Sequence, residues 1–225
     1  MHEMKMALRN TFMKTNPSSN SSRALAVHSA LVAFFAVANA LAPSVEAAGA
    51  KFNKVLSIGD AAPEWTNLPG VDDKLHNLSD YREAKVIVMV FTCNHCPVAK
   101  MYEERLVEFA RKYERKVQVV AISVSHHGAD GLEKMKVRAA ERGMSYQYLY
   151  DESQKSARSY GATVTPHFFV LNGERQIAYM GAFDDNFEPD RVEKHYLTDA
   201  VEALLAGNEP RVKESLQRGC AIDYE

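Results

Sequence analysis

The feature that most constrains this chain is the segment Cys93–Pro97, which reads CNHCP. It follows the apolar run 86–91 and precedes an amphipathic stretch. Two cysteines separated by two residues, placed between a strand and a helix, are typical of a thiol redox motif. A helix start offers unpaired N–H groups and the positive end of the helix dipole, and both favour a thiolate. One sulfur can then attack a disulfide, and the second can resolve the mixed disulfide.

The pattern around this motif predicts alternating strands and helices. Apolar runs indicate strands at 85–91, 117–124, 146–150 and 167–171. Apolar residues at three- and four-residue steps indicate helices at 97–113, 130–142, 153–160 and 191–206. Asn172-Gly173 predicts a two-residue hairpin leading to a strand at 176–183. This order predicts a three-layer α/β/α domain with a central mixed sheet.

The first 47 residues have the pattern of an export signal. Basic residues precede the apolar run 24–42, and small residues follow, which predicts cleavage after Ala47 or Ala50. The alternative is an uncleaved membrane anchor, because the run is long enough to span. Residues 48–225 then form one domain, with a C-terminal tail from about 207. Both readings place the domain in the periplasm or another extracytoplasmic space, where cysteine pairs more often handle disulfides than zinc.

Charge argues against some classes of partner. The chain has 27 Lys and Arg against 29 Asp and Glu, without a basic block, so we expect no nucleic-acid partner. We expect protein or small-molecule thiols and disulfides as substrates, together with a redox partner. We expect membrane contact only through an uncleaved N-terminal segment, and no cofactor.

Four stretches together resemble the thioredoxin-like superfamily. These are Ile58–Trp65, Val90–Pro97, Tyr148–Gly161 and the Thr165-Pro166 pair before the last predicted buried strand. Within the superfamily, the chain is similar to the redoxin group, which contains peroxiredoxins and exported thiol-disulfide reductases. The tail segment Gly219–Ile222 resembles that of an uncharacterised peroxiredoxin-like branch. The resemblance implies a thioredoxin fold and a thiol-disulfide oxidoreductase.

The same resemblance implies a role for each site residue. Cys93 would be the exposed nucleophile, and Cys96 the buried resolving thiol. Pro166 would follow a cis peptide bond, which is affordable mainly before proline. Thr165 would offer backbone hydrogen bonds to a bound substrate strand.

His95 stands where reductive members of the superfamily usually have proline, and in this it resembles the strong periplasmic thiol oxidase. Its ring would stabilise the Cys93 thiolate and make the protein more oxidising. The alternative is a loop histidine that faces solvent and has no electronic effect. The strand before the motif has no buried acid, and Ala99 stands where the reductases place a glutamate. The proton acceptor for Cys96 therefore has no candidate.

Two alternatives to disulfide exchange stay open. The first is a peroxiredoxin-like thiol peroxidase with antioxidant activity, although the peroxide-binding pattern of Thr or Ser three residues before the cysteine is absent. The second is a non-enzymatic metal-binding module, in which His126 and His127 would join Cys93 and Cys96. That spacing is not a zinc-finger spacing, so we expect no metal.

Cys220 is the third thiol and lies in the C-terminal tail. It could resolve Cys93, cross-link two chains, or have no redox role. We expect the tail to be flexible and able to reach the active site. We nevertheless expect Cys220 to be a dispensable accessory thiol, because Cys96 would resolve from a fixed position one turn away.

Overall fold

The computed structural model describes residues 50–225. The expected export signal lies outside the described residues. Among the residues described, no helix is long and apolar enough to cross a membrane. The first regular elements are a small hairpin of β1 (Leu68–Pro69) and β2 (Leu75–His76), followed by the 3₁₀ helix η1 (Leu78–Tyr81).

A five-stranded mixed sheet forms the centre of the domain, in the order β5-β4-β3-β7-β8. β3 pairs in parallel with β4, and β4 with β5, whereas β7 is antiparallel to both β3 and β8. The bounds are β3 (Ile87–Thr92), β4 (Gln118–Ser123), β5 (Gln147–Tyr150), β7 (His167–Leu171) and β8 (Ile177–Gly181).

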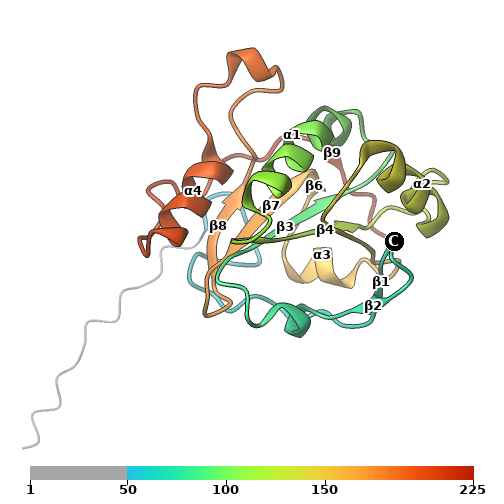
Figure 1. The fold of residues 1–225 in the computed structure, drawn as a ribbon, viewed down its shortest axis with the longest axis horizontal. Helices are drawn as coiled ribbons and strands as arrows, with labels where there is room; N and C mark the ends of the chain where they lie inside the picture. The colour runs from blue at the N-terminus through green and yellow to red at the C-terminus, as the bar shows by residue number, and fades with distance from the viewer. Residues whose placement is uncertain (1–49) are drawn as a thin grey trace, which may run out of the picture. The chain divides into compact units, whose positions relative to one another are not determined.

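Helices cover both faces of this sheet. α1 (Pro97–Tyr113), α2 (Leu132–Arg142) and α4 (Tyr196–Leu205) contribute to one hydrophobic cluster, and α3 (Lys155–Ser159) contributes to the other. Figure 1 shows α1 and α3 on opposite sides of the sheet. The predicted three-layer thioredoxin fold with a mixed sheet is confirmed.

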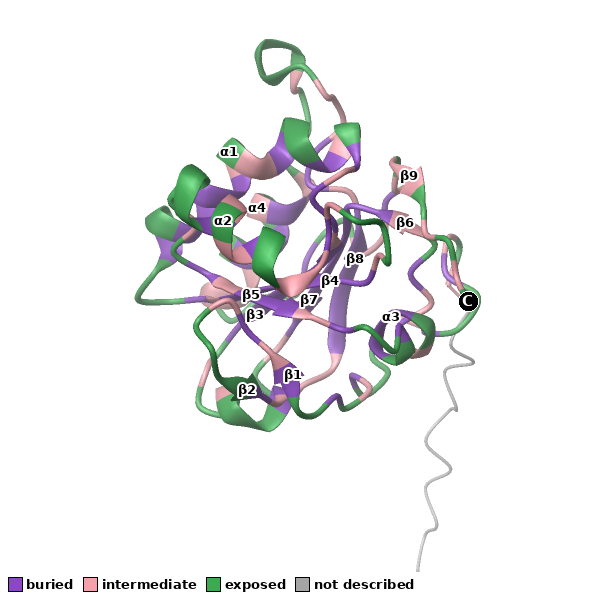
Figure 2. Ribbon diagram, turned by 90° about the vertical axis from the view of Figure 1, so that its right-hand side faces the viewer, coloured by how far each residue is buried: buried purple, intermediate pink, exposed green. Residues whose placement is uncertain are grey.

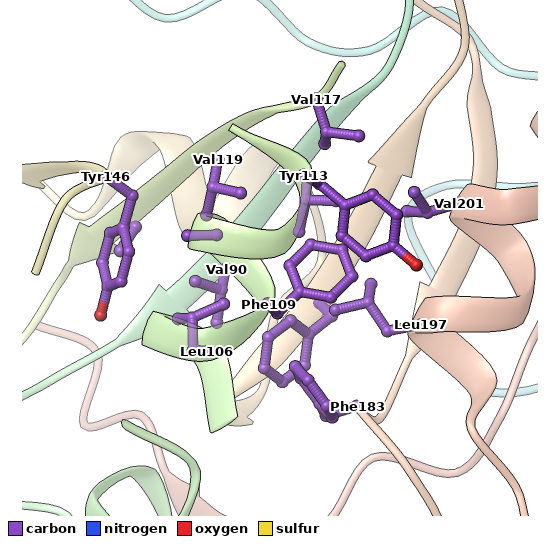
Figure 3. Packing of buried hydrophobic residues seen from close by; sticks show 14 of the residues in the cluster. Val90, Leu106, Phe109, Tyr113, Val117, Val119, Tyr146, Phe183, Leu197 and Val201 are labelled. Atoms are coloured by element: carbon purple, nitrogen blue, oxygen red, sulfur yellow. The ribbon is translucent and has the colours of Figure 1, made fainter. Parts of the chain in front are cut away.

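The central strand β3 contributes side chains to the hydrophobic clusters on both faces of the sheet. Val88 and Val90 point into the cluster under α1, which Figure 3 shows from close by, whereas Met89 and Phe91 point into the opposite cluster. All four side chains are at most 1% exposed. A strand buried on both faces reads as a continuous apolar run, as this one does. Figure 2 shows the buried residues concentrated along the sheet.

The turn after β7 differs from the predicted two-residue hairpin. Leu171 pairs with Ile177, so the connection is longer than Asn172-Gly173. Arg175, rather than the glycine, adopts a left-handed conformation with φ 61°. The Asn172 side chain accepts the N–H of Gln176 at 2.9 Å and thereby closes the larger loop.

The last helix begins five residues later than predicted, at Tyr196 instead of residue 191. The segment before it contains the 3₁₀ helix η2 (Pro189–Arg191). There the Asp185 carboxylate accepts the N–H groups of Glu193 and Lys194, at 3.0 and 3.1 Å. These bonds hold the chain in a loop, and His195 becomes the residue that precedes the helix.

The C-terminal tail is paired, and the expectation of a flexible tail is wrong. It forms a short strand, β9 (Cys220–Ala221), antiparallel to β6 (Val164–Thr165). In this register Thr165 lies opposite Cys220. The pairing brings residues from the end of the chain to the motif after β3.

Candidate active site

The motif lies at the junction of β3 and α1. Cys96 is the N-cap of α1, and its Sγ accepts the N–H of Ala99 at 3.4 Å. Pro97 occupies the first helical position, where its missing N–H costs nothing. The Cys96 side chain has no exposed surface. The predicted burial of Cys96 at the helix start is thus confirmed.

Cys93 is not an exposed nucleophile, because it is only 4% exposed. Its Sγ lies 3.4 Å from Oγ1 of Thr165. Burial raises the pKa of the Cys93 thiol, the Thr165 hydroxyl opposes this rise, and the Asp130 carboxylate adds to it. The expectation of a Cys93 thiolate does not hold in this state, because burial outweighs the backbone hydrogen bonds of Cys96 and His95, which lower the pKa of Cys93.

The disulfide in the structure joins Cys96 to Cys220, with 6.0 Å between the Cα atoms. This separation lies within the range that disulfides span. Cys93 is the free thiol. The pairing differs from the expected Cys93–Cys96 pair, because β9 delivers Cys220 directly to the start of α1. The tail, which was expected to be flexible, instead holds Cys220 against the motif.

The loop before β7 completes the site. The Thr165-Pro166 peptide bond is cis, as predicted. The carbonyl oxygen of Thr165 lies 3.2 Å from Sγ of Cys96. The backbone of Thr165, which was expected to bind a substrate strand, pairs with the tail at Cys220 in this structure.

His95 faces a carboxylate that the sequence reasoning missed. Its Nδ1 lies 2.5 Å from Oδ2 of Asp130, and its backbone N–H donates to Oδ1 at 2.9 Å. The Asp130 side chain is fully buried, whereas that of His95 is 38% exposed. The only sequence signal for Asp130 was its position at the start of a predicted helix. The ring of His95 is therefore oriented by a buried acid from the loop before α2.

The two histidines after β4 do not form the considered metal site. Nε2 of His126 lies 2.6 Å from the carbonyl oxygen of Glu152, and Nδ1 of the same ring lies 2.9 Å from Oε1 of Glu225. His127 stacks on His95, with 4.6 Å between ring centroids. Neither joins Cys96, whose sulfur is in the disulfide.

A different group of ligating atoms does converge among the residues that the structure describes. One atom each from Cys93, His95 and Asp130 lie within 4.8 Å of one another. Thiolate, imidazole and carboxylate are ligands that zinc accepts. In this structure the short bond between His95 and Asp130 already occupies two of the three residues.

Hydrogen bonds fix the turn between the two motif cysteines. The Asn94 amide donates to the carbonyl oxygen of Ala129 at 2.8 Å. The hydroxyl of Tyr148, from β5, donates to the other end of the same amide at 2.8 Å. A cavity of about 320 Å³ adjoins the motif, and its lining includes Cys93, His95 and Ile222 of the tail.

Comparison with known proteins gives a family match. The model of the AhpC/TSA family matches residues 58–180. No curated protein matches the chain. The family match supports a thiol redox function. The three cysteines of the chain gather at this site.

Solved structures with the same fold include two proteins without an assigned activity. A hypothetical protein from Sinorhizobium meliloti 1021 is 29% identical, with a TM-score of 0.71 over 77% of this chain and 97% of its own. An uncharacterized conserved protein from Geobacillus kaustophilus is 32% identical, with a TM-score of 0.71 over 77% and 95%. A peroxidoxin from Mycobacterium tuberculosis, 18% identical with a TM-score of 0.53 over 67% and 96%, shares the fold.

Proposed function

Because the chain belongs to the AhpC/TSA family, we propose that it is a thiol-disulfide oxidoreductase that uses Cys93 and Cys96. One observation carries this proposal. Cys96, at the start of α1, already forms a disulfide, while Cys93 is a free thiol three positions away in the same motif. A disulfide beside a free thiol is the arrangement that thiol exchange requires.

The proposed reaction begins with the reduced protein. The Cys93 thiolate attacks one sulfur of a substrate disulfide, forms a mixed disulfide and releases the first substrate thiolate. Cys96 then attacks Sγ of Cys93 and releases the second thiolate, which leaves a Cys93–Cys96 disulfide. Two electrons pass to the substrate. The raised pKa of Cys93 belongs to the state with the Cys96–Cys220 disulfide, in which its thiol is protected from side reactions.

An anaerobic titration of the reduced protein tests this function against its alternatives. The proposal expects two-electron reduction of a small disulfide with no metal bound. Preferential consumption of hydrogen peroxide would instead support the thiol peroxidase. Stoichiometric zinc or copper, retained by the reduced protein through Cys93, His95 and Asp130, would support the metal-binding module.

His95 is proposed to make the Cys93–Cys96 couple more oxidising. We expect His95→Ala, measured in a Cys220→Ser background against glutathione buffers, to lower the reduction potential by at least about 30 mV. For two electrons this corresponds to about 1.4 kcal/mol. Alanine is a cleaner substitution than proline, because proline would also remove the N–H that His95 donates to Asp130. His126→Ala is the matched control and should leave the potential unchanged; an unchanged or raised potential in His95→Ala contradicts this role.

We propose that the domain acts outside the cytoplasm on protein or small-molecule thiols and disulfides, with a separate redox partner. The support is the basic and apolar N-terminal sequence with its small residues near position 47. N-terminal sequencing of protein from the native host is expected to start near residue 48 or 51. A soluble cytoplasmic protein that starts at Met1 would refute export, and a membrane-bound one would favour the anchor.

A further inference from the structure

We propose that Cys220 is the third redox-active cysteine of the site. It exchanges with the Cys93–Cys96 disulfide to form a Cys96–Cys220 disulfide, which an external dithiol then reduces. This inference rests on the proposed function. Cys220 is already bonded to Cys96, so the two sulfurs can reach each other without rearrangement of the fold. The same Cys96 sulfur would then serve two partners in turn, Cys93 on one side and Cys220 on the other.

The tail is anchored on the N-terminal side of Cys220. The backbone N–H of Met180, in β8, donates to the carbonyl oxygen of Lys213 at 3.0 Å. The hydroxyls of Tyr179 and Ser215 lie 2.7 Å apart, and both residues are buried. These contacts hold the tail against the edge of the sheet several residues before Cys220.

The tail is anchored equally on the other side of Cys220. The N–H of Ile222 donates to the carbonyl oxygen of Thr163 at 3.0 Å. The hydroxyl of Tyr224 donates to the carbonyl oxygen of Ala162 at 2.6 Å. The side-chain amide of Gln154 donates to the carbonyl oxygen of Asp223 at 2.8 Å. The position of Cys220 is thus fixed by bonds that do not depend on the disulfide, so its thiol stays near Cys96 after reduction.

Gly219 shows how closely the tail approaches the site. A Cβ at this position would lie 2.1 Å from the carbonyl oxygen of Thr165. That oxygen is itself 3.2 Å from Sγ of Cys96. Only a residue without a side chain allows the strand to lie this near, and the close approach serves to present the next residue, Cys220, to Cys96.

Exposure distinguishes the three cysteines. Cys96 is fully buried and Cys93 is 4% exposed, whereas Cys220, in β9, is partly exposed. An external dithiol has access to Cys220 before the other two. Rates of exchange depend on access to the attacked sulfur. Cys220 is therefore the sulfur at which the oxidised protein meets its reductant.

The relay adds two balanced steps to the reaction. The Cys220 thiolate attacks Sγ of Cys96 in the Cys93–Cys96 disulfide, forms the Cys96–Cys220 bond and releases Cys93 as a thiolate, with no net oxidation. An external dithiol then attacks Sγ of Cys220 and releases the Cys96 thiolate. The second thiol of the reductant resolves this mixed disulfide, so that the reductant leaves as a disulfide and all three protein thiols are regenerated.

The test follows the disulfide bonds during turnover. Reduced full-length protein is mixed with one equivalent of a small disulfide, quenched with acid at intervals, alkylated and mapped by mass spectrometry. We expect Cys93–Cys96 to appear first and to convert to Cys96–Cys220. Cys220→Ser should stop at Cys93–Cys96 and lose ten- to a hundredfold in steady-state turnover with dithiothreitol, while release of the substrate thiols keeps its rate.

A second variant keeps the thiol and displaces it. Gly219→Val should behave like Cys220→Ser, because its side chain meets the Thr165 carbonyl, whereas Leu216→Ser, at a 53% exposed tail position, is the matched control and should keep full turnover. The relay would be overturned, with the proposed function intact, if Cys220→Ser turned over within twofold of the wild-type rate and the oxidised wild-type protein kept its Cys93–Cys96 disulfide without converting it. A Cys96–Cys220 bond that persists through every cycle would also overturn it, since the bond would then be structural only.

Discussion

Replacing Cys93 with serine is expected to lower turnover of a small disulfide by at least about a thousandfold, or about 4 kcal/mol at the transition state. A serine hydroxyl at this buried position is not ionised at neutral pH and cannot attack sulfur. The Cys96–Cys220 disulfide does not involve this residue, so the variant should fold and keep that bond. Steady-state turnover with dithiothreitol as the reductant measures the loss.

The outcome separates two ways of using the cysteines. His126→Ala, near the same cavity but bonded to Glu152 and Glu225, is the control and should keep turnover within twofold. If Cys93→Ser also turns over at nearly the wild-type rate, Cys96 and Cys220 form the working pair, and the assignment of Cys93 as nucleophile is wrong.

Replacing Cys96 with serine is expected to produce a trapped intermediate. Cys93 can still attack a substrate disulfide, but the resolving sulfur is missing, so a mixed disulfide accumulates on Cys93. Cys96→Ser would leave Cys220 as a free, partly exposed thiol beside the motif, so the variant is made in a Cys220→Ser background. We therefore expect about one adduct per chain, and turnover lowered by at least about a thousandfold, which corresponds to about 4 kcal/mol.

Intact mass and peptide mapping check this result. The adduct should carry half of the substrate disulfide and map to Cys93. The triple variant Cys93→Ser/Cys96→Ser/Cys220→Ser has no thiol and should carry no adduct. A Cys96→Ser/Cys220→Ser protein that carries no adduct, or that still turns over, would contradict the order of steps proposed for the motif.

Much of the fold could be predicted because its signals are local. The apolar run of β3 and the spacing along α1 place both elements within two residues of their predicted bounds, and the structure gives α1 as Pro97–Tyr113. Both features depend on neighbours in the sequence. The cis bond at Pro166 was expected from the resemblance to the thioredoxin-like superfamily, and the structure has it.

The features that could not be predicted depend on long-range contacts. The pairing of β6 with β9 joins Thr165 to Cys220, and nothing in the tail sequence indicates which edge it meets. Asp130 lies 35 residues from His95, and only the fold brings its carboxylate to the ring. The burial of Cys93 likewise results from packing around the motif, so a nucleophile expected to be exposed is covered.

The central claim, two-electron exchange through protein thiols, is tested most directly by counting thiols. The fully reduced protein has three cysteines, and it is mixed anaerobically with one equivalent of oxidised glutathione. We predict that two protein thiols are lost per chain and that two equivalents of glutathione are released, with no glutathione left on the protein. Three remaining thiols, or a stable adduct that holds one glutathione, would contradict the account.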